Sequence, residues 1–193
     1  MKRICVFCGS STGFDPRHAQ AARALGGTLA QRRLGLVYGG GHVGLMGILA
    51  DAVLAADGEA VGVIPEVLME REVGHHGLTE LHVVGSMHER KARMAELSDG
   101  FIALPGGIGT LEEFFEVWTW AQLGLHRKPV GLLNVAGYFD YLIAFLDHTV
   151  AQGFLQDRHR ALVLEDRDPA AMLDRFERYQ APAVAKWLDR QST

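Results

Sequence analysis

Residues 100–113 read Gly-Phe-Ile-Ala-Leu-Pro-Gly-Gly-Ile-Gly-Thr-Leu-Glu-Glu and carry the signals that decide the fold. A short apolar run ends at Leu104, a glycine-rich turn follows, and a helical pattern begins at Thr110. A short apolar run bounded by turn residues indicates a strand. The stretch therefore predicts one strand–turn–helix unit of an α/β protein.

The same alternation continues along the rest of the chain. Strands are expected at residues 3–8, 35–38, 59–64, 81–84, 100–104, 130–133 and 161–164. Helices are expected at residues 16–33, 43–56, 86–97, 110–123, 138–152, 169–179 and 183–190. Because the connections are short, we predict a Rossmann-like, doubly wound parallel sheet with helices on both faces. Residues 65–79 break the alternation, and since they follow a strand they should overhang the ligand end of the sheet.

Size and composition favour a single globular domain. A chain of 193 residues with 22% charged residues predicts one catalytic domain over residues 1–180 and a helical tail over 181–193. The net charge of −4 gives no reason to expect a nucleic-acid partner. No stretch approaches the roughly 18 apolar residues of a membrane span, and the opening apolar run is too short for a signal peptide. We therefore expect a cytoplasmic protein without a membrane partner.

The cysteine and histidine patterns do not predict a metal site. Cys5 and Cys8 lie in one expected strand, where positions i and i+3 point to opposite faces, so their thiols should diverge. A second cysteine pair, which a zinc site would need, is absent from the sequence. The adjacent His75 and His76 lack the helical spacing of a metal pair, and we expect both to be solvated loop histidines.

Three glycine-rich turns follow expected strands and precede expected helices. They lie at residues 8–13, 39–47 and 105–110, and in a parallel sheet all three should converge on one end. Glycines allow close approach of the backbone to a ligand, and helix N-termini favour an anion. Ser10, Ser11 and Thr110 add hydroxyl groups. Each turn alone is compatible with an ordinary tight connection, but three at one end predict a phosphate site.

The second turn also matches the dinucleotide fingerprint G-x-G-x-x-G at Gly39, Gly41 and Gly44. That fingerprint belongs to the first strand–helix turn and needs an acidic residue at the end of the next strand. Glu59 is at the right spacing but begins its strand, so it should lie at the wrong end of the sheet. No Walker A sequence is present either. We therefore expect neither a dinucleotide site of this type nor a P-loop.

Charged residues interrupt two expected helices. Arg90 lies on the otherwise apolar face formed by Met87, Met94 and Leu97, which should be buried. Its guanidinium either extends to solvent or meets an anion at the end of the sheet, and Lys91 could do the same. Acidic residues in a first helical turn commonly complement the helix dipole.

Glu113 nevertheless follows the turn assigned to phosphate so closely that a catalytic role would explain it. We expect Glu112 to be more solvated than Glu113. Glu116 lies one turn further along the same side of the helix.

These residues resemble a known family. Met87-His88-Glu89-Arg90-Lys91 followed by residues 105–113 is similar to the M-x-x-R-K and P-G-G-x-G-T-x-x-E motifs of the LONELY GUY (LOG) family, the cytokinin riboside 5′-monophosphate phosphoribohydrolases. Residues 6–11 and 38–47 also resemble family segments. The similarity extends to about Gln152.

The resemblance implies hydrolysis of N6-modified adenosine 5′-monophosphates, and often of AMP, to the free base and ribose 5-phosphate, with no cofactor and no metal. It implies that Arg90 and Glu113 are the catalytic pair. The expected substrate-binding residues are Glu72, Lys91, Gly107, Ile108, Gly109, Thr110, Leu111, Glu112 and Thr119, with Ser10 and Gly41 from the other turns. Ile108 occupies a position that is often Tyr in plant members, which should alter a contact and leave the chemistry intact.

The resemblance also implies a homodimer, and the helix expected at residues 110–123 supports it. Its apolar residues lie on more than one face, so one face can pack on the sheet and another on a second subunit.

Two other functions remain open on the sequence. A pyridoxal-phosphate decarboxylase would need a Schiff-base lysine, and only Lys91 lies near the expected site. A nucleotide-binding or carrier protein without turnover would share the glycine-rich turns. Such a carrier would not need both Arg90 and Glu113, so their joint presence favours an enzyme.

Overall fold

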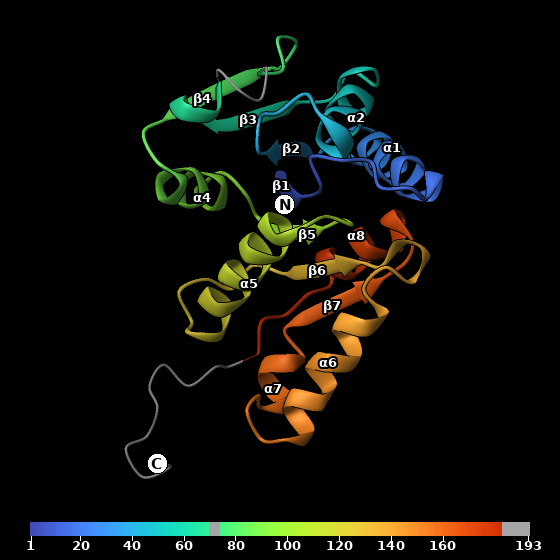
Figure 1. Cartoon of the computed structure of the whole chain (residues 1–193), viewed down its shortest axis with the longest axis vertical. Coiled ribbons are helices and arrows are strands. Elements are labelled where there is room, and N and C mark those ends of the chain that lie inside the picture. Colours follow the sequence, from blue (N-terminus) through green and yellow to red (C-terminus); the bar gives the residue numbers. More distant parts are fainter. Residues whose placement is uncertain (70–73, 183–193) are drawn as a thin grey trace.

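A computed structural model describes residues 1–69 and 74–182 and confirms the α/β fold (Figure 1). The strands are β1 (Arg3–Phe7), β2 (Gly35–Tyr38), β3 (Ala60–Pro65), β4 (Glu80–Val84), β5 (Gly100–Ala103), β6 (Val130–Leu133) and β7 (Val163–Asp166). The helices are α1 (Pro16–Gln31), α2 (Gly44–Leu54), α3 (Glu66–Met69), α4 (Met87–Glu96), α5 (Ile108–Gln122), α6 (Asp140–Ala151), α7 (Asp157–Arg160) and α8 (Pro169–Glu177). A short 3₁₀ helix spans Val135–Gly137.

All seven strands form one parallel sheet in the order β4-β3-β2-β1-β5-β6-β7. Every residue of β2, β3, β5 and β6 is buried, as expected for inner strands covered on both faces. The edge strand β4 is mostly exposed. The direction of strand addition changes between β1 and β5, and such a switch point is where α/β sheets bind ligands beyond the strand ends.

Helices cover both faces of the sheet, as predicted. Figure 1 shows α1 and α2 on one side of the sheet and α4 and α5 on the other. The apolar core is correspondingly divided into two clusters: one includes residues of α1, α2 and α8, and the other includes residues of α4, α5 and α6. Cys5 belongs to the second cluster and Cys8 to the first, which confirms that the two thiols diverge. Burial raises the pKa of both thiols.

The boundaries differ from the predictions where local patterns are short. The segment expected to be irregular contains α3, and an unpredicted helix, α7, precedes β7, whose start lies two residues later than expected. The turn after β6 holds a 3₁₀ helix, so α6 begins at Asp140 and not at Tyr138. The helix expected at 183–190 lies outside the described residues. Among those that are described, no helix is long and apolar enough to cross a membrane.

Candidate active site

The three glycine-rich turns meet at the carboxyl end of the sheet, as predicted. Gly9 N donates to Pro105 O at 3.1 Å, which joins the turn after β1 to the turn after β5. Leu45 N donates to Gly9 O at 3.0 Å, which joins the turn after β2 to the turn after β1. The approach is so close that a Cβ on Gly44, whose φ is +59°, would lie 2.2 Å from the carbonyl carbon of Ser10. The backbone of one glycine-rich surface is thus assembled from distant segments.

The N-terminus of α5 presents free backbone donors to this surface. Gly107 caps the helix without a side-chain hydrogen bond. Among the described residues, no acceptor is found for the N–H groups of Gly107, Ile108 and Gly109. These three residues are exposed, and the Thr110 side chain behind them is buried. Unpaired N–H groups and the positive end of the helix dipole together suit an anion such as phosphate.

Arg90 is buried at the same end of the sheet, with only 7% of its surface exposed. Its Nε donates to Val63 O and its Nη2 donates to Gly39 O, both at 3.1 Å. The guanidinium is therefore fixed by main-chain carbonyls at the ends of β2 and β3 and does not extend to solvent. A buried cation held by neutral acceptors keeps its charge available to a negative group.

Met87 departs from the prediction for this helix face. It is 41% exposed and not buried, and it is the first residue of α4. Its sulfur lies 3.7 Å from Arg90 Nη1.

Glu113 lies one turn into α5 and is partly buried. Burial raises the pKa of its carboxyl to about 7, against the lowering influence of the Arg90 charge and with a further raising influence from Glu112. A carboxyl group with such a pKa exchanges a proton readily near neutral pH, which is the property of a general acid or base.

Glu112, one residue earlier, is exposed and ion-paired with Lys91 at 2.5 Å. The predicted difference in solvation between the adjacent carboxylates is confirmed. The ammonium of the buried Lys91 also lies 3.0 Å from Glu116, so two carboxylates hold it.

Comparison with known proteins identifies the family. A probable cytokinin riboside 5′-monophosphate phosphoribohydrolase of Oryza sativa subsp. japonica, LOGL9, is 53% identical over 178 residues, which cover 92% of this chain and 78% of that protein. The cytokinin riboside 5′-monophosphate phosphoribohydrolase LOG7 of Arabidopsis thaliana is 51% identical over 179 residues, covering 93% and 82%. The chain belongs to the LOG family. Residues 46–176 also match the protein family described as "Possible lysine decarboxylase".

Solved structures similar to this LOG protein confirm its fold. The molybdenum cofactor carrier protein of Chlamydomonas reinhardtii has a TM-score of 0.70 at 22% identity, covering 92% of this chain and 99% of that chain. A molybdenum cofactor binding protein of Rippkaea orientalis has a TM-score of 0.69 at 22% identity, covering 92% and 97%. At this level of identity the likeness concerns the fold alone.

The other expected substrate-binding residues are distributed differently. Glu72 lies outside the described residues. Thr119 is exposed, donates its hydroxyl to Phe115 O at 2.7 Å, and lies about 13 Å along α5 from Thr110 at 1.5 Å per residue. Leu111 is partly buried beside the core. Ser10 is exposed in the first turn, and Gly41 is buried in the second, where it pairs with Gly74.

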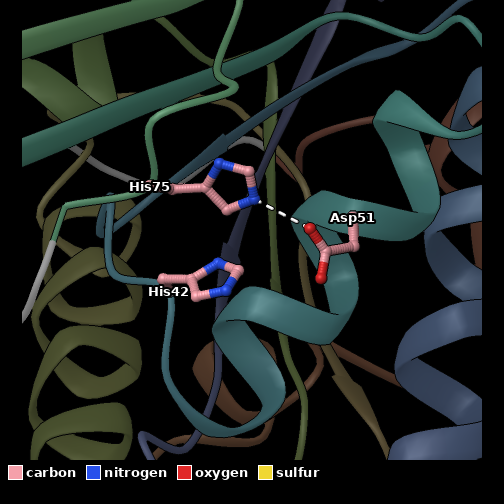
Figure 2. A group of neighbouring side chains, drawn as sticks. All are labelled: His42, Asp51 and His75. Atoms are coloured by element: carbon pink, nitrogen blue, oxygen red, sulfur yellow. Dashed lines mark hydrogen bonds and ion pairs between the residues drawn. The ribbon is translucent and has the colours of Figure 1, made fainter.

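His75 does not fit the prediction of a solvated loop histidine. It is 8% exposed, and its Nε2 lies 2.9 Å from Asp51 Oδ1, with the His42 ring beside it (Figure 2). Gly77 N donates to His75 Nδ1 at 3.1 Å, so Nε2 carries the proton and donates to Asp51. His42, Asp51 and His75 offer nitrogen and oxygen atoms within 4.8 Å of one another, an arrangement that a metal ion could use. In this tautomer, however, His75 Nε2 carries a hydrogen directed at Asp51 and has no lone pair to offer a metal. His76 is exposed, as predicted.

Sequence reasoning did not single out Tyr138. Its hydroxyl donates to Gly106 O at 2.6 Å, in the turn that leads into α5. The available signal was its place in the connection that follows β6, because such a connection lies at the ligand end of a parallel sheet.

Proposed function

We propose that this LOG protein hydrolyses the N-glycosidic bond of N6-modified adenosine 5′-monophosphates, and of AMP, to the free base and ribose 5-phosphate. The observation that carries the proposal is the juxtaposition of Glu113, with its raised pKa, and an α5 N-terminus that has free backbone donors. The first supplies acid–base chemistry, and the second supplies a phosphate site one turn away. Gly109 and Glu113 are four residues apart, about 6 Å along the helix at 1.5 Å per residue, so one nucleotide could contact both.

The phosphate would lie on the N–H groups of Gly107, Ile108 and Gly109, with the Thr110 hydroxyl near them. These donors are already in place, so little ordering is required when the substrate binds. Binding energy from the phosphate then holds the ribose near Glu113, remote from the phosphate itself.

Glu113 would act on the anomeric carbon. As the bond between C1′ and the base nitrogen breaks, its electron pair leaves with the base and positive charge develops on the ribose ring. The Glu113 carboxylate stabilises that charge and accepts a proton from the water that attacks C1′. The departing base takes up a proton from solvent and Glu113 releases its proton to solvent, so that one water is divided overall between the ribose 5-phosphate and the base.

Arg90 would act chiefly through its charge. Two of its nitrogens donate to Val63 O and Gly39 O, which fixes the guanidinium, and Nη1 meets only the weak acceptor Met87 Sδ. Its positive charge keeps the pKa of Glu113 from rising further, so a useful fraction of carboxylate is present at neutral pH. Arg90 is thus suited to tune and orient the carboxylate.

The decarboxylase alternative is disfavoured by the state of Lys91. A Schiff-base lysine must be neutral and reach its cofactor, but Lys91 is held between Glu112 and Glu116, and its ion pairs raise its pKa. An absorbance scan for a bound pyridoxal chromophore would reveal that alternative. A carrier without turnover would not need a proton-exchanging carboxyl group beside its phosphate site.

We further propose that the enzyme is a homodimer with α5 near the interface. Leu123 and Leu125, at and beyond the end of α5, are 58% and 71% exposed, and Phe115 and Trp120 are only partly buried. A second subunit would cover these apolar side chains. Thr119 is exposed on α5, about two and a half turns beyond Thr110, and a dimer would allow it to serve the partner's site. Light scattering at micromolar concentration should give at least twice the chain mass, and a monomer mass would contradict the proposal.

Chromatographic product analysis with a panel of nucleotides and nucleosides tests the activity. AMP and isopentenyladenosine monophosphate should yield free base and ribose 5-phosphate. The unphosphorylated nucleosides should react far more slowly, because they lack the group that the α5 N-terminus binds. Equal turnover of nucleotide and nucleoside would contradict the assignment of the glycine-rich turn to phosphate.

A further inference from the structure

Tyr138 connects the end of β6 to the turn that forms the proposed phosphate site. Its hydroxyl donates to Gly106 O at 2.6 Å. Its ring packs edge-on against His18 of α1, with centroids 5.6 Å apart, and against Phe139 at 5.0 Å. The side chain is thus supported from two sides while 44% of its surface remains exposed.

The backbone before Tyr138 adopts a conformation that requires support. Ala136 and Gly137 have φ values of +55° and +75°, and alanine is disfavoured in this region. The buried amide of Asn134 stabilises the turn: its Oδ1 accepts from Phe139 N at 2.8 Å and its Nδ2 donates to Asp140 at 2.6 Å. The buried Asn134 side chain thus fixes this turn in a strained conformation, and with it the position of Tyr138, which directly follows the turn.

The acceptor of Tyr138 belongs to a peptide group for which no other hydrogen bond is found among the described residues. The Gly106 carbonyl and the Gly107 N–H share one planar peptide unit and point in opposite directions. Because both residues are glycines, this unit can flip at little steric cost, which would reverse the Gly107 N–H. Gly107 has φ −88°, and a flip would bring that angle to about +90°, a region open to glycine and closed to alanine.

We propose that Tyr138 is a positioning residue that locks the Gly106–Gly107 peptide with its N–H directed to the substrate phosphate. This inference rests on the proposed function, since it assumes that the α5 N-terminus binds the phosphate. By holding the carbonyl, the hydroxyl preorganises a donor that the nucleotide would otherwise have to orient on binding. Tyr138 acts on phosphate affinity and takes no part in bond cleavage.

The test compares Tyr138→Phe with the matched control Tyr141→Phe, which removes the same atom from a side chain that is 91% exposed on α6. We expect Tyr138→Phe to raise KM for AMP and Kd for ribose 5-phosphate about 3- to 10-fold, the effect of one net hydrogen bond, with kcat within about twofold. Calorimetric affinity for adenosine, which has no phosphate, should not change. Tyr141→Phe should match the wild type in every measurement.

A second variant separates a peptide lock from general loosening. Gly107→Ala disfavours the flipped peptide, and its Cβ would meet no heavy atom within 4 Å. Added to Tyr138→Phe, it should restore part of the lost affinity for ribose 5-phosphate. Unchanged phosphate affinity in Tyr138→Phe, or an equal loss for adenosine and AMP, would overturn the inference. Wild-type protein that binds ribose 5-phosphate but does not hydrolyse AMP would contradict the proposed reaction alone.

Discussion

The two ends of the parallel sheet each hold an arginine and a glutamate, in opposite electrostatic situations. At the amino end, Arg3 binds Glu59 through two hydrogen bonds of 2.9 and 2.7 Å, and this contact lowers the pKa of Glu59. At the carboxyl end, Arg90 donates hydrogen bonds to two main-chain carbonyls, and burial raises the pKa of Glu113 to about 7. Arg3 and Glu59 thus neutralise each other directly, whereas Arg90 donates to neutral carbonyl groups and keeps its charge unpaired by them.

This difference separates a structural pair from a reactive one. A bidentate ion pair at the surface adds modest stability and holds each group in its charged form. A carboxyl group that is poorly solvated, and whose neighbouring cation donates its hydrogen bonds to other acceptors, is disfavoured as an anion. Its pKa therefore rises to a range where it exchanges a proton readily. The carboxyl end also carries the glycine-rich turns. The contrast therefore predicts which end loses activity and which end loses stability when its charges are removed.

The largest effect is expected from Glu113→Gln, which keeps the shape and removes the charge. If the carboxylate stabilises a cationic transition state or activates water, turnover of AMP should fall on the order of 10²- to 10⁴-fold. Affinity for AMP, measured by calorimetric titration, should be kept or improved, because the carboxylate repels the phosphate. Glu59→Gln at the other end should leave turnover within about twofold. Near-wild-type rates in Glu113→Gln would return Glu113 to the role of a helix N-terminal residue and would remove it from the catalytic pair.

The sequence predicted the ends of the sheet correctly because strand polarity can be read locally. Glu59 begins its strand, and that alone assigned it to the end away from the glycine-rich turns, where it binds Arg3. The convergence of the three turns followed in the same way from their position after strands. The expected difference in solvation between the adjacent Glu112 and Glu113 was also confirmed.

The partners of the buried side chains could not be predicted. Arg90 was recognised as anomalous on an apolar face. Its acceptors, however, are the main-chain oxygens of Val63 and Gly39, which lie 27 and 51 residues earlier in the sequence. Because every residue has a main-chain carbonyl, the pattern of residue types cannot indicate which one accepts the hydrogen bond. The burial of His75 depends in the same way on Asp51 of α2 and Gly77, which only the folded chain brings together.

Replacing each arginine by methionine keeps the volume and removes the charge, and extends the comparison. Arg90→Met should lower kcat/KM for AMP about 10²-fold, since a positioned cation near the reacting groups is lost. It should also lower the unfolding temperature, because Val63 O and Gly39 O lose their donors. Arg3→Met should affect stability slightly and kcat/KM hardly at all. Similar rates for Arg90→Met and Arg3→Met would remove the distinction between the two ends.

The pH dependence of kcat/KM gives a finer test of the carboxyl end. If Glu113 must be ionised, activity should fall about tenfold per pH unit below an apparent pKa near 7. The Arg90 charge lowers the pKa of Glu113, so in Arg90→Met this acid limb should move to higher pH. Arg3→Met should leave the limb in place. An acid limb near pH 4 in the wild type would show that no carboxyl group with a raised pKa controls the reaction.

The smallest effect concerns stability, and there the two glutamates should respond with opposite signs. The pKa of Glu113 is about 7 in the folded protein against 4.5 in the reference state, so the folded form binds its proton more tightly. The resulting stability is present below about pH 4.5 and is lost as the pH rises toward 7. Relative to the wild type, Glu113→Gln should therefore be more stable at pH 8, by about 1–2 kcal/mol for this partly buried group, and nearly equal at pH 4.5. Glu59→Gln should be less stable at pH 8, by about 0.2–1 kcal/mol, since it removes an ion pair that depends on an ionised carboxylate. Urea unfolding of both variants at the two pH values, at one protein concentration, measures these differences. A loss of stability at pH 8 in Glu113→Gln would mean that its carboxylate is held in the folded protein as favourably as that of Glu59, and the electrostatic contrast between the two ends would not stand.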